Sequence, residues 1–339
     1  MPAEWPIAAL PGGKRSNRAS ALAAAGSWRL ETIVQDLFLA PEARLTEQER
    51  ALMMAMLHGL IERIAVELRA RLSPDAAAAV DVSTSDLIVD LTRAKLLQNE
   101  QLVSMLLRRA DVQRLASTGR SGRSTLQRWT ASKDADVAAA AMTLVSARGR
   151  GRDRFGRIAL DLSDLSAPLA SHLVNAVAAA LALRCPEVSD AAAAEAASAL
   201  LAERADTSSP EELEAALVEA LGSEGRQAPG LLAGLAEEGE APLLAAILAA
   251  EAGIPGDEAW SALLGGPESV ALLLGLAGLP RSEAAALLAA ASAALGIGDP
   301  GRAIDAFDEI SAEEMEEARA EFALPAAYRD ARRMLRHHG

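Results

Sequence analysis

The stretch of sequence that decides the fold class is residues 46–72, TEQERALMMAMLHGLIERIAVELRARL. It opens with Thr46 and Glu49, which have the spacing of a capping box at the start of a helix. Its large apolar residues then recur at intervals of three and four, which places them on one face of a helix. These residues are Met53, Met56, Leu57, Leu60, Ile61, Ile64 and Leu68. The stretch therefore predicts a long amphipathic helix that buries this stripe against other helices.

The composition extends the helical prediction to the whole chain. Among 339 residues there are 78 Ala and 51 Leu, whereas aromatic residues make up only 3%. Ala and Leu favour helices, and the β-branched and aromatic residues that build sheets are scarce. An all-β domain or a parallel sheet is therefore excluded, and we expect an all-α fold with almost no strand.

Proline and capping residues mark where helices begin, and in residues 158–339 they predict helices of roughly 10 to 18 residues with short turns. Ser73-Pro74 and the capping box Ser311–Glu314 mark two helix starts, and Ser209 and Asp299 are expected caps. We also expect helices near residues 86–97 and 100–117. Six further prolines stand where first turns are expected: Pro210, Pro229, Pro242, Pro267, Pro280 and Pro300.

Two turns in the C-terminal half are similar to one another. Residues 252–259, AGIPGDEA, resemble residues 277–284, AGLPRSEA, at an offset of 25 residues. Gly253 and Gly278 are placed to end one helix in the left-handed conformation, and a proline then starts the next. The similarity favours a HEAT-like α-solenoid of stacked helix pairs. An irregular multi-helix bundle stays open as the alternative.

Three segments resemble a bacterial, all-helical, HEAT-like-repeat family classed as a domain of unknown function. They are residues 102–110 (LVSMLLRRA), residues 160–165 (LDLSDL) leading into the helix around His172, and the turn within residues 276–288. The resemblance covers most of residues 30–300, and the Ala-rich run from 191 to 221 departs from it. It implies a fold rather than a chemistry.

The distribution of charge suggests three regions. Residues 1–29 are expected to form a mobile leader, residues 30–157 an N-terminal helical domain, and residues 158–339 an acidic helical-repeat region. The net charge is -14 overall. Residues 108–157 nevertheless hold twelve basic and four acidic side chains (+8), and residues 187–327 hold five basic and 27 acidic ones (-22). Such asymmetry produces a surface field that steers partners.

The residue types that carry catalysis do not form a recognisable pattern in this sequence. His58, His172, His337 and His338 lack the spacing of a zinc site, and Asp161 with Asp164 suits a turn better than an acid–base pair. We therefore expect no enzyme activity, cofactor or metal. The lone Cys185 and the absence of a targeting signal or a membrane span of about 20 residues indicate a cytoplasmic protein.

The basic segment gives the functional prediction. Because helical repeats offer extended surfaces and need no catalytic site, we expect a non-enzymatic protein-interaction scaffold or regulator. Arginine binds carboxylates bidentately, so we expect the partner segment to be acidic. The expected partner-binding residues are Arg148, Arg150, Arg152, Arg154 and Arg157 in a Gly/Arg loop. One alternative is that Arg108, Arg109 and Arg114 pair with the acidic half of the same chain and that the loops are simply solvated. Two others are nucleic-acid binding by residues 108–157, which include Trp129, and an enzyme with an unrecognised site.

Overall fold

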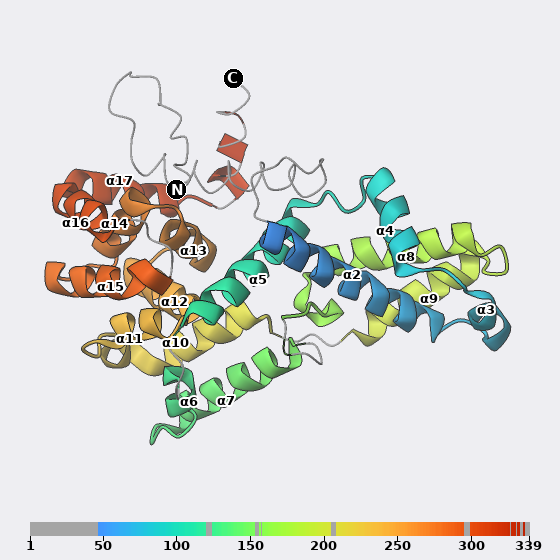
Figure 1. The fold of residues 1–339 in the computed structure, drawn as a ribbon, viewed down its shortest axis with the longest axis horizontal. Helices are drawn as coiled ribbons and strands as arrows, with labels where there is room; N and C mark the ends of the chain where they lie inside the picture. The colour runs from blue at the N-terminus through green and yellow to red at the C-terminus, as the bar shows by residue number, and fades with distance from the viewer. Residues whose placement is uncertain are drawn as a thin grey trace.

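A computed structural model describes residues 47–119, 124–152, 156, 158–204, 208–294, 299–325, 327–329, 331, 332 and 335 (Figure 1). Within these residues every regular element is a helix, and the extended backbone forms only an isolated bridge between Arg152 and Ile158. The predicted all-α fold class is confirmed.

The first of two hydrophobic cores is built on α2 (Glu47–Arg69). All seven apolar residues of its predicted stripe are buried, so that prediction is confirmed. Helix α2 packs against four others of this core, α4, α5, α8 and α9. The remaining helices of the first core are α3 (Pro74–Ala79), α4 (Thr84–Arg93), the first part of α5 (Glu100–Thr118), α8 (Ala167–Arg184) and α9 (Asp190–Glu203).

Helix α8 is the one described helix that is long and apolar enough to cross a membrane. Nine of its side chains are buried in the first core, including Leu173, Val177 and Leu181. Its apolar character is thus used in packing against α2, α4 and α9.

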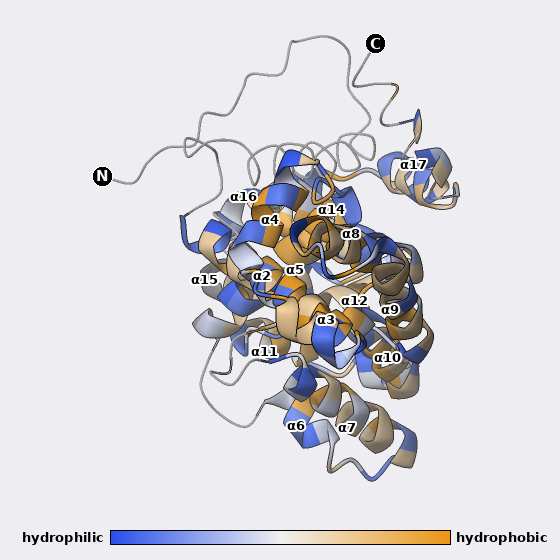
Figure 2. Ribbon diagram, turned by 90° about the vertical axis from the view of Figure 1, so that its right-hand side faces the viewer, coloured by the Kyte–Doolittle hydropathy of each residue, from blue (hydrophilic) through white to orange (hydrophobic). Residues whose placement is uncertain are grey.

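The second core surrounds α12 (Ala241–Ala252), of whose twelve residues nine are buried. A helix that is apolar on all sides is expected at the centre of a bundle. Figure 2 shows hydrophobic segments of α12 and α14 in the interior. The other helices of this core are α6 (Thr125–Trp129), α7 (Ala135–Arg150), α10 (Pro210–Arg226), α11 (Leu231–Glu237), α13 (Gly256–Leu264), α14 (Pro267–Leu276), α15 (Arg281–Ala294), α16 (Pro300–Glu309) and α17 (Ala312–Phe322).

The two cores do not divide the chain at residue 157, where the charge changes. Helices α6 and α7 pack in the second core, and the chain then returns to the first core for α8 and α9. Helix α5 belongs to both, because Leu102 and Leu106 lie in the first core and Leu115 in the second. In Figure 1, α5 runs between the two groups of helices.

The two similar turns have the backbone that their sequence predicts. Gly253 (φ 66°) and Gly278 (φ 69°) both adopt the left-handed conformation, and each is followed by a proline and a new helix. The helices that follow pack differently, however. Helix α13 folds back on α12, whereas α15 packs against α11 and α16. The two similar turns therefore do not begin helix pairs with the same packing, although the alternate helices α10, α12, α14 and α16 contact one another in series.

The helix starts follow the predicted capping residues. Ser73, Ser209 and Asp299 each accept a hydrogen bond from a backbone N–H of the helix that they begin, and Ser311 forms the expected capping box with Glu314. Thr46 lies outside the described residues. The helix expected to reach residue 97 instead ends at Arg93, because Lys95 turns the chain with a left-handed φ of 58°.

Candidate functional site

The five arginines expected to bind a partner do not share one environment. Helix α7 continues to Arg150, so Arg148 and Arg150 lie on a helix and the Gly/Arg loop begins later than expected. Arg150 and Arg152 are exposed, and Arg152 donates to the carbonyl oxygen of Gly156 at 2.7 Å. Arg154 and Arg157 lie outside the described residues.

Arg148 points into the protein and is held by two carboxylates. Its guanidinium lies 2.7 Å from Glu240 Oε2 and 3.1 Å from Glu214 Oε1. Because a helix turns about 100° per residue, side chains two positions apart point to nearly opposite sides. Arg148 therefore points to Glu214 and Glu240, whereas Arg150 leaves α7 in another direction and is exposed.

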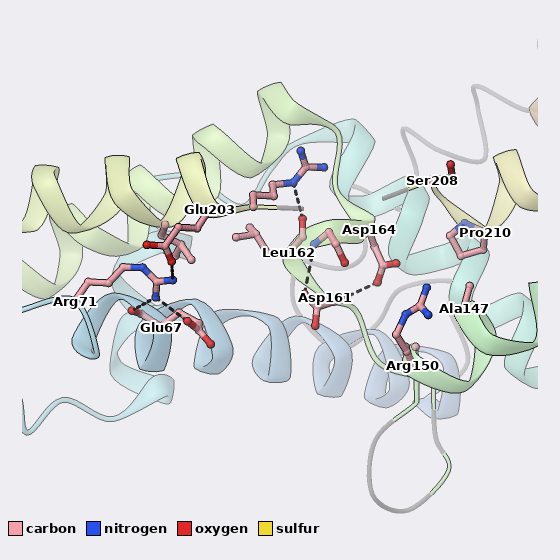
Figure 3. A pocket seen from close by; sticks show the side chains of 14 residues that line it. Glu67, Arg71, Ala147, Arg150, Asp161, Leu162, Asp164, Glu203, Ser208 and Pro210 are labelled. Carbon is pink, nitrogen blue, oxygen red and sulfur yellow. Dashed lines mark hydrogen bonds and ion pairs between the residues drawn. The ribbon is translucent and has the colours of Figure 1, made fainter. Parts of the chain in front are cut away.

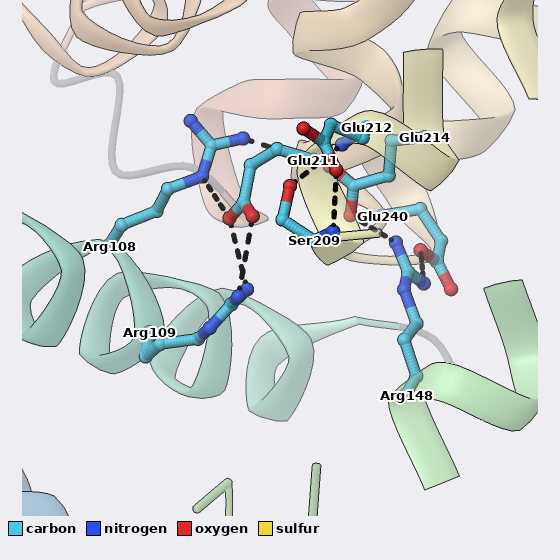
Figure 4. Close-up of polar contacts among 8 residues, drawn as sticks. All are labelled: Arg108, Arg109, Arg148, Ser209, Glu211, Glu212, Glu214 and Glu240. Atoms are coloured by element: carbon cyan, nitrogen blue, oxygen red, sulfur yellow. Dashed lines mark hydrogen bonds and ion pairs between the residues drawn. The ribbon is translucent and has the colours of Figure 1, made fainter. Parts of the chain in front are cut away.

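The two ion pairs of Arg148 continue into a longer network (Figure 4). Glu214 lies 3.7 Å from Arg108 on α5, and Arg108 lies 3.0 Å from Glu211 on α10. Glu211 is bound bidentately by Arg109, at 3.1 and 3.3 Å. Three arginines thus alternate with three glutamates, and their charges balance.

An aromatic ring supports the network from the second core. The guanidinium of Arg108 stacks over the Trp260 ring, 4.7 Å from its centroid. Trp260 is buried on α13. Such cation–π contacts are strongest where water is excluded. The network therefore joins α5, α7 and α10 to α13.

Burial and charge act in opposite directions on the acids of the network. Burial raises the pKa of Glu214 above its ordinary value, although Arg148 and Arg108 pull it down. Burial also disfavours the ionised form of Glu211, but the charges of Arg109 and Arg108 outweigh it and lower the pKa of Glu211. For Arg148, the charges of Glu240 and Glu214 outweigh burial and raise the pKa. Glu214 is thus the acid of the network whose ionised form burial disfavours most.

The turn before α12 fastens α6 to the second core. Glu238 accepts hydrogen bonds from the backbone N–H of Thr125 at 2.6 Å and from its hydroxyl at 2.9 Å, and it pairs with Arg128 at 3.1 Å. At Gly239 (φ 72°) an added Cβ would lie 2.6 Å from the carbonyl oxygen of Leu115. Only glycine permits this close approach of the turn to the end of α5.

A cleft of about 410 Å³ opens beside the network, between the two cores. Helices α2 and α9 with the 3₁₀ turn η1 (Leu162–Asp164) form one side, and α7 with the start of α10 forms the other (Figure 3). Arg71 in this cleft is bound by Glu67 at 2.7 Å and by Glu203 at 2.5 Å. The charged residues that line it are Glu67, Arg71, Arg150, Asp161, Asp164, Glu203 and Arg204.

Within the part of the chain that the structure describes, Arg150 and Asp164 line the cleft without a bound opposite charge, and unlike Arg204 they are not tied across it by backbone carbonyls. Among the described residues, the guanidinium of Arg150 has no hydrogen bond or ion pair, and no cation contacts the carboxylate of Asp164. Figure 3 shows Arg150 pointing toward Asp164 and Pro210. Burial raises the pKa of Asp164, although a hydrogen bond from the Asp161 amide and the charge of Arg109 lower it.

The other residues considered for chemistry have structural roles. Asp161 and Asp164 form a capping box around η1, as expected for a turn. His172 Nε2 lies 2.8 Å from the carbonyl oxygen of Leu96, and His58 lies on α2 at 4.0 Å from Glu62. Cys185 is buried as a free thiol. His337 and His338 lie outside the described residues.

Sequence reasoning did not identify the glutamates that complete the network. They lie 66, 92 and 102 positions from their arginine partners, so no local pattern joins them. One local signal was present. Glu214 lies three and four residues before Leu217 and Val218, which places an acid within the buried stripe of α10. An acid in that position indicates a buried ion pair.

Comparison with known proteins gave one match. The model of a family described as "Uncharacterised protein conserved in bacteria (DUF2336)" matches residues 91–325. This range includes the α5–α7–α10 network and every residue that lines the cleft except Glu67 and Arg71. No curated protein and no solved structure matches the chain.

Proposed function

The chain belongs to this uncharacterised bacterial family, and we propose that it is a non-enzymatic protein-interaction scaffold or regulator that binds an acidic protein segment. The observation that supports the proposal is the contrast between Arg148 and its neighbours. Arg148 is bound by two carboxylates, whereas Arg150 and Arg152 are exposed and no carboxylate of the described residues is bound to them. They offer donors to an incoming carboxylate.

The nearby carboxylates favour an acidic protein segment over a nucleic acid. Arg108, Arg109, Arg128 and Arg148 already bind carboxylates of the same chain. These pairings reduce the number of cations available for a row of phosphates, on whose number the affinity for nucleic acid depends. A single carboxylate needs only one arginine. The lone cysteine supports placing this function in the cytoplasm.

The proposal is tested by affinity capture from nuclease-treated cell extract, with mass spectrometry. The bait is the full chain, the double variant Arg150→Ser/Arg152→Ser, or the control Arg93→Ser. Arg93 is also an exposed arginine near a helix end, but it lies on α4 in the first core. We expect a protein partner that the wild type and Arg93→Ser retain and that the double variant loses.

Binding measurements with the purified partner then give the size of the effect on Kd. The double variant loses charge-assisted hydrogen bonds, so its Kd for the partner should rise by roughly tenfold or more. Raising the salt concentration should also raise the Kd of the wild type. Equal retention by all three baits would refute the role of these arginines. Material that is captured from a parallel untreated extract but not from the nuclease-treated extract would favour the nucleic-acid alternative.

A further inference from the structure

The cleft between the two cores has the position and size of a ligand site. Its volume of about 410 Å³ lies within the range of about 300–1,000 Å³ that is usual for such sites. Its two sides come from different cores, and sites commonly form at such junctions. Its lining belongs to α2, η1, α7, α9 and α10, with Ser208 just before α10.

Most of the charged groups in the cleft are already engaged. Arg71 holds Glu67 and Glu203, and Arg204 donates to the carbonyl oxygens of Leu162 and Leu165. Asp161 pairs with Arg63 at 3.4 Å. These contacts hold the walls of the cleft in place and occupy the charged groups that make them.

Arg150 and Asp164 differ from this group. Arg150 comes from α7 of the second core and Asp164 from η1 of the first core, and both line the cleft without an ion pair between them. One oxygen of Asp164 accepts from the amide of Asp161 at 2.8 Å, which fixes the carboxylate in place. The cleft therefore offers a cationic donor and a fixed acceptor from opposite sides.

These two groups define the chemistry of a suitable ligand. The ligand must carry an acceptor of negative charge for Arg150 and an N–H donor for Asp164. A phosphate is disfavoured, because four carboxylates line the cleft against three arginines and would repel a dianion. A carboxylate with a peptide N–H a few bonds away matches both groups.

We propose that the cleft binds a carboxylate-bearing peptide segment of the partner, with Arg150 holding the carboxylate bidentately and Asp164 accepting a peptide N–H. This rests on the proposed scaffold function and names the contact that it uses. The carboxylate comes either from an Asp or Glu side chain or from a free C-terminus, since the two share the same chemistry. Arg152 then lies outside the cleft and attracts the acidic partner as it approaches.

Two phage-displayed libraries of random peptides, one with free C-termini and one with internal segments, provide the probes. Each is selected on the wild-type full chain. The best peptide of each library is synthesised with a fluorescein label, and its Kd is measured by fluorescence anisotropy. We expect at least one peptide whose Kd rises roughly tenfold or more with Arg150→Met. With Asp164→Asn, which keeps the acceptor oxygen and loses the charge, it should rise severalfold.

Two comparisons separate the sources of the carboxylate. Amidation of the C-terminus should abolish binding if the terminal carboxylate occupies the cleft. Replacement of Asp and Glu by Asn and Gln should abolish it if a side chain does. Arg93→Ser should bind each peptide as the wild type does, and CD spectra and urea unfolding establish that each variant is folded.

The inference is overturned if no selected peptide depends on Arg150 and Asp164, or if neither carboxylate change weakens binding. Its failure is distinguishable from failure of the scaffold proposal. A captured partner that needs Arg150 and Arg152 but binds Asp164→Asn unchanged refutes the cleft and supports the scaffold. A partner that needs none of these residues refutes both.

Discussion

Replacing Arg148 with Met should lower the free energy of unfolding by about 3–5 kcal/mol. The substitution removes two charge-assisted hydrogen bonds, at 2.7 and 3.1 Å, each of which contributes about 1.5–3 kcal/mol. It also leaves Glu214, whose side chain is 5% exposed, with Arg108 at 3.7 Å as its remaining cation in the network. Methionine keeps most of the aliphatic packing, so the decrease in unfolding free energy reports the loss of the charged interactions.

Urea unfolding followed by CD at 222 nm measures this loss, and Arg150→Met is the matched control. The control lies two residues away on the same helix and is exposed, so it should change the free energy of unfolding by less than about 0.5 kcal/mol. Adding Glu214→Gln to Arg148→Met should recover about 1 kcal/mol or more, because it removes the stranded charge. Equal stability of Arg148→Met and Arg150→Met would refute the structural role of the network.

Three further predictions concern other parts of the molecule. Ile64→Asp, at a position 1% exposed on α2, should cost more than about 3 kcal/mol in unfolding free energy. Val66→Asp on the same helix, 60% exposed, should cost less than about 0.5 kcal/mol, and similar melting of both variants would contradict the burial of the stripe. Gly239→Ala should destabilise by more than about 2 kcal/mol, because it adds a backbone clash to the strain of positive φ. Gly253→Ala meets no atom within 4 Å and should cost about 1 kcal/mol in the same urea assay, so equal losses would argue against the clash. Burial raises the pKa of Asp164, so the ionised carboxylate destabilises the folded protein. This destabilisation is lost as the pH falls through the raised pKa toward the unfolded value of about 3.9. The free energy of unfolding of Asp164→Asn, relative to that of the wild type, should therefore be highest at pH 7 and lowest near pH 4 in urea unfolding. The opposite trend would contradict the raised pKa.

The fold class and many helix starts could be predicted because they depend on local sequence. The α2 stripe repeats at helical spacing, and Ser311 with Glu314 caps a helix through residues three apart. The packing partners could not be predicted in the same way. Helix α12 is apolar on nearly every side, so its sequence contains no direction of packing.

The candidate site was predicted only in part. The sequence pattern predicts one Gly/Arg loop, whereas the structure places the described arginines of this cluster in different environments. Because α7 continues to Arg150, helical geometry sends Arg148 inward and Arg150 outward. Asp164 was expected in a turn, and it forms one; its place opposite Arg150 depends on how η1 and α7 meet in space.

The sharing of α5 between both cores limits how the protein can be dissected. A fragment that ends at residue 157 would lose α8 and α9, which cover α2, and it would leave α6 and α7 without α10. A fragment that begins at residue 158 would lack Leu115, together with Arg108 and its contact with Trp260. No single cut of the chain therefore separates the two cores. We expect limited proteolysis within α5 to unfold both cores and to leave no stable fragment.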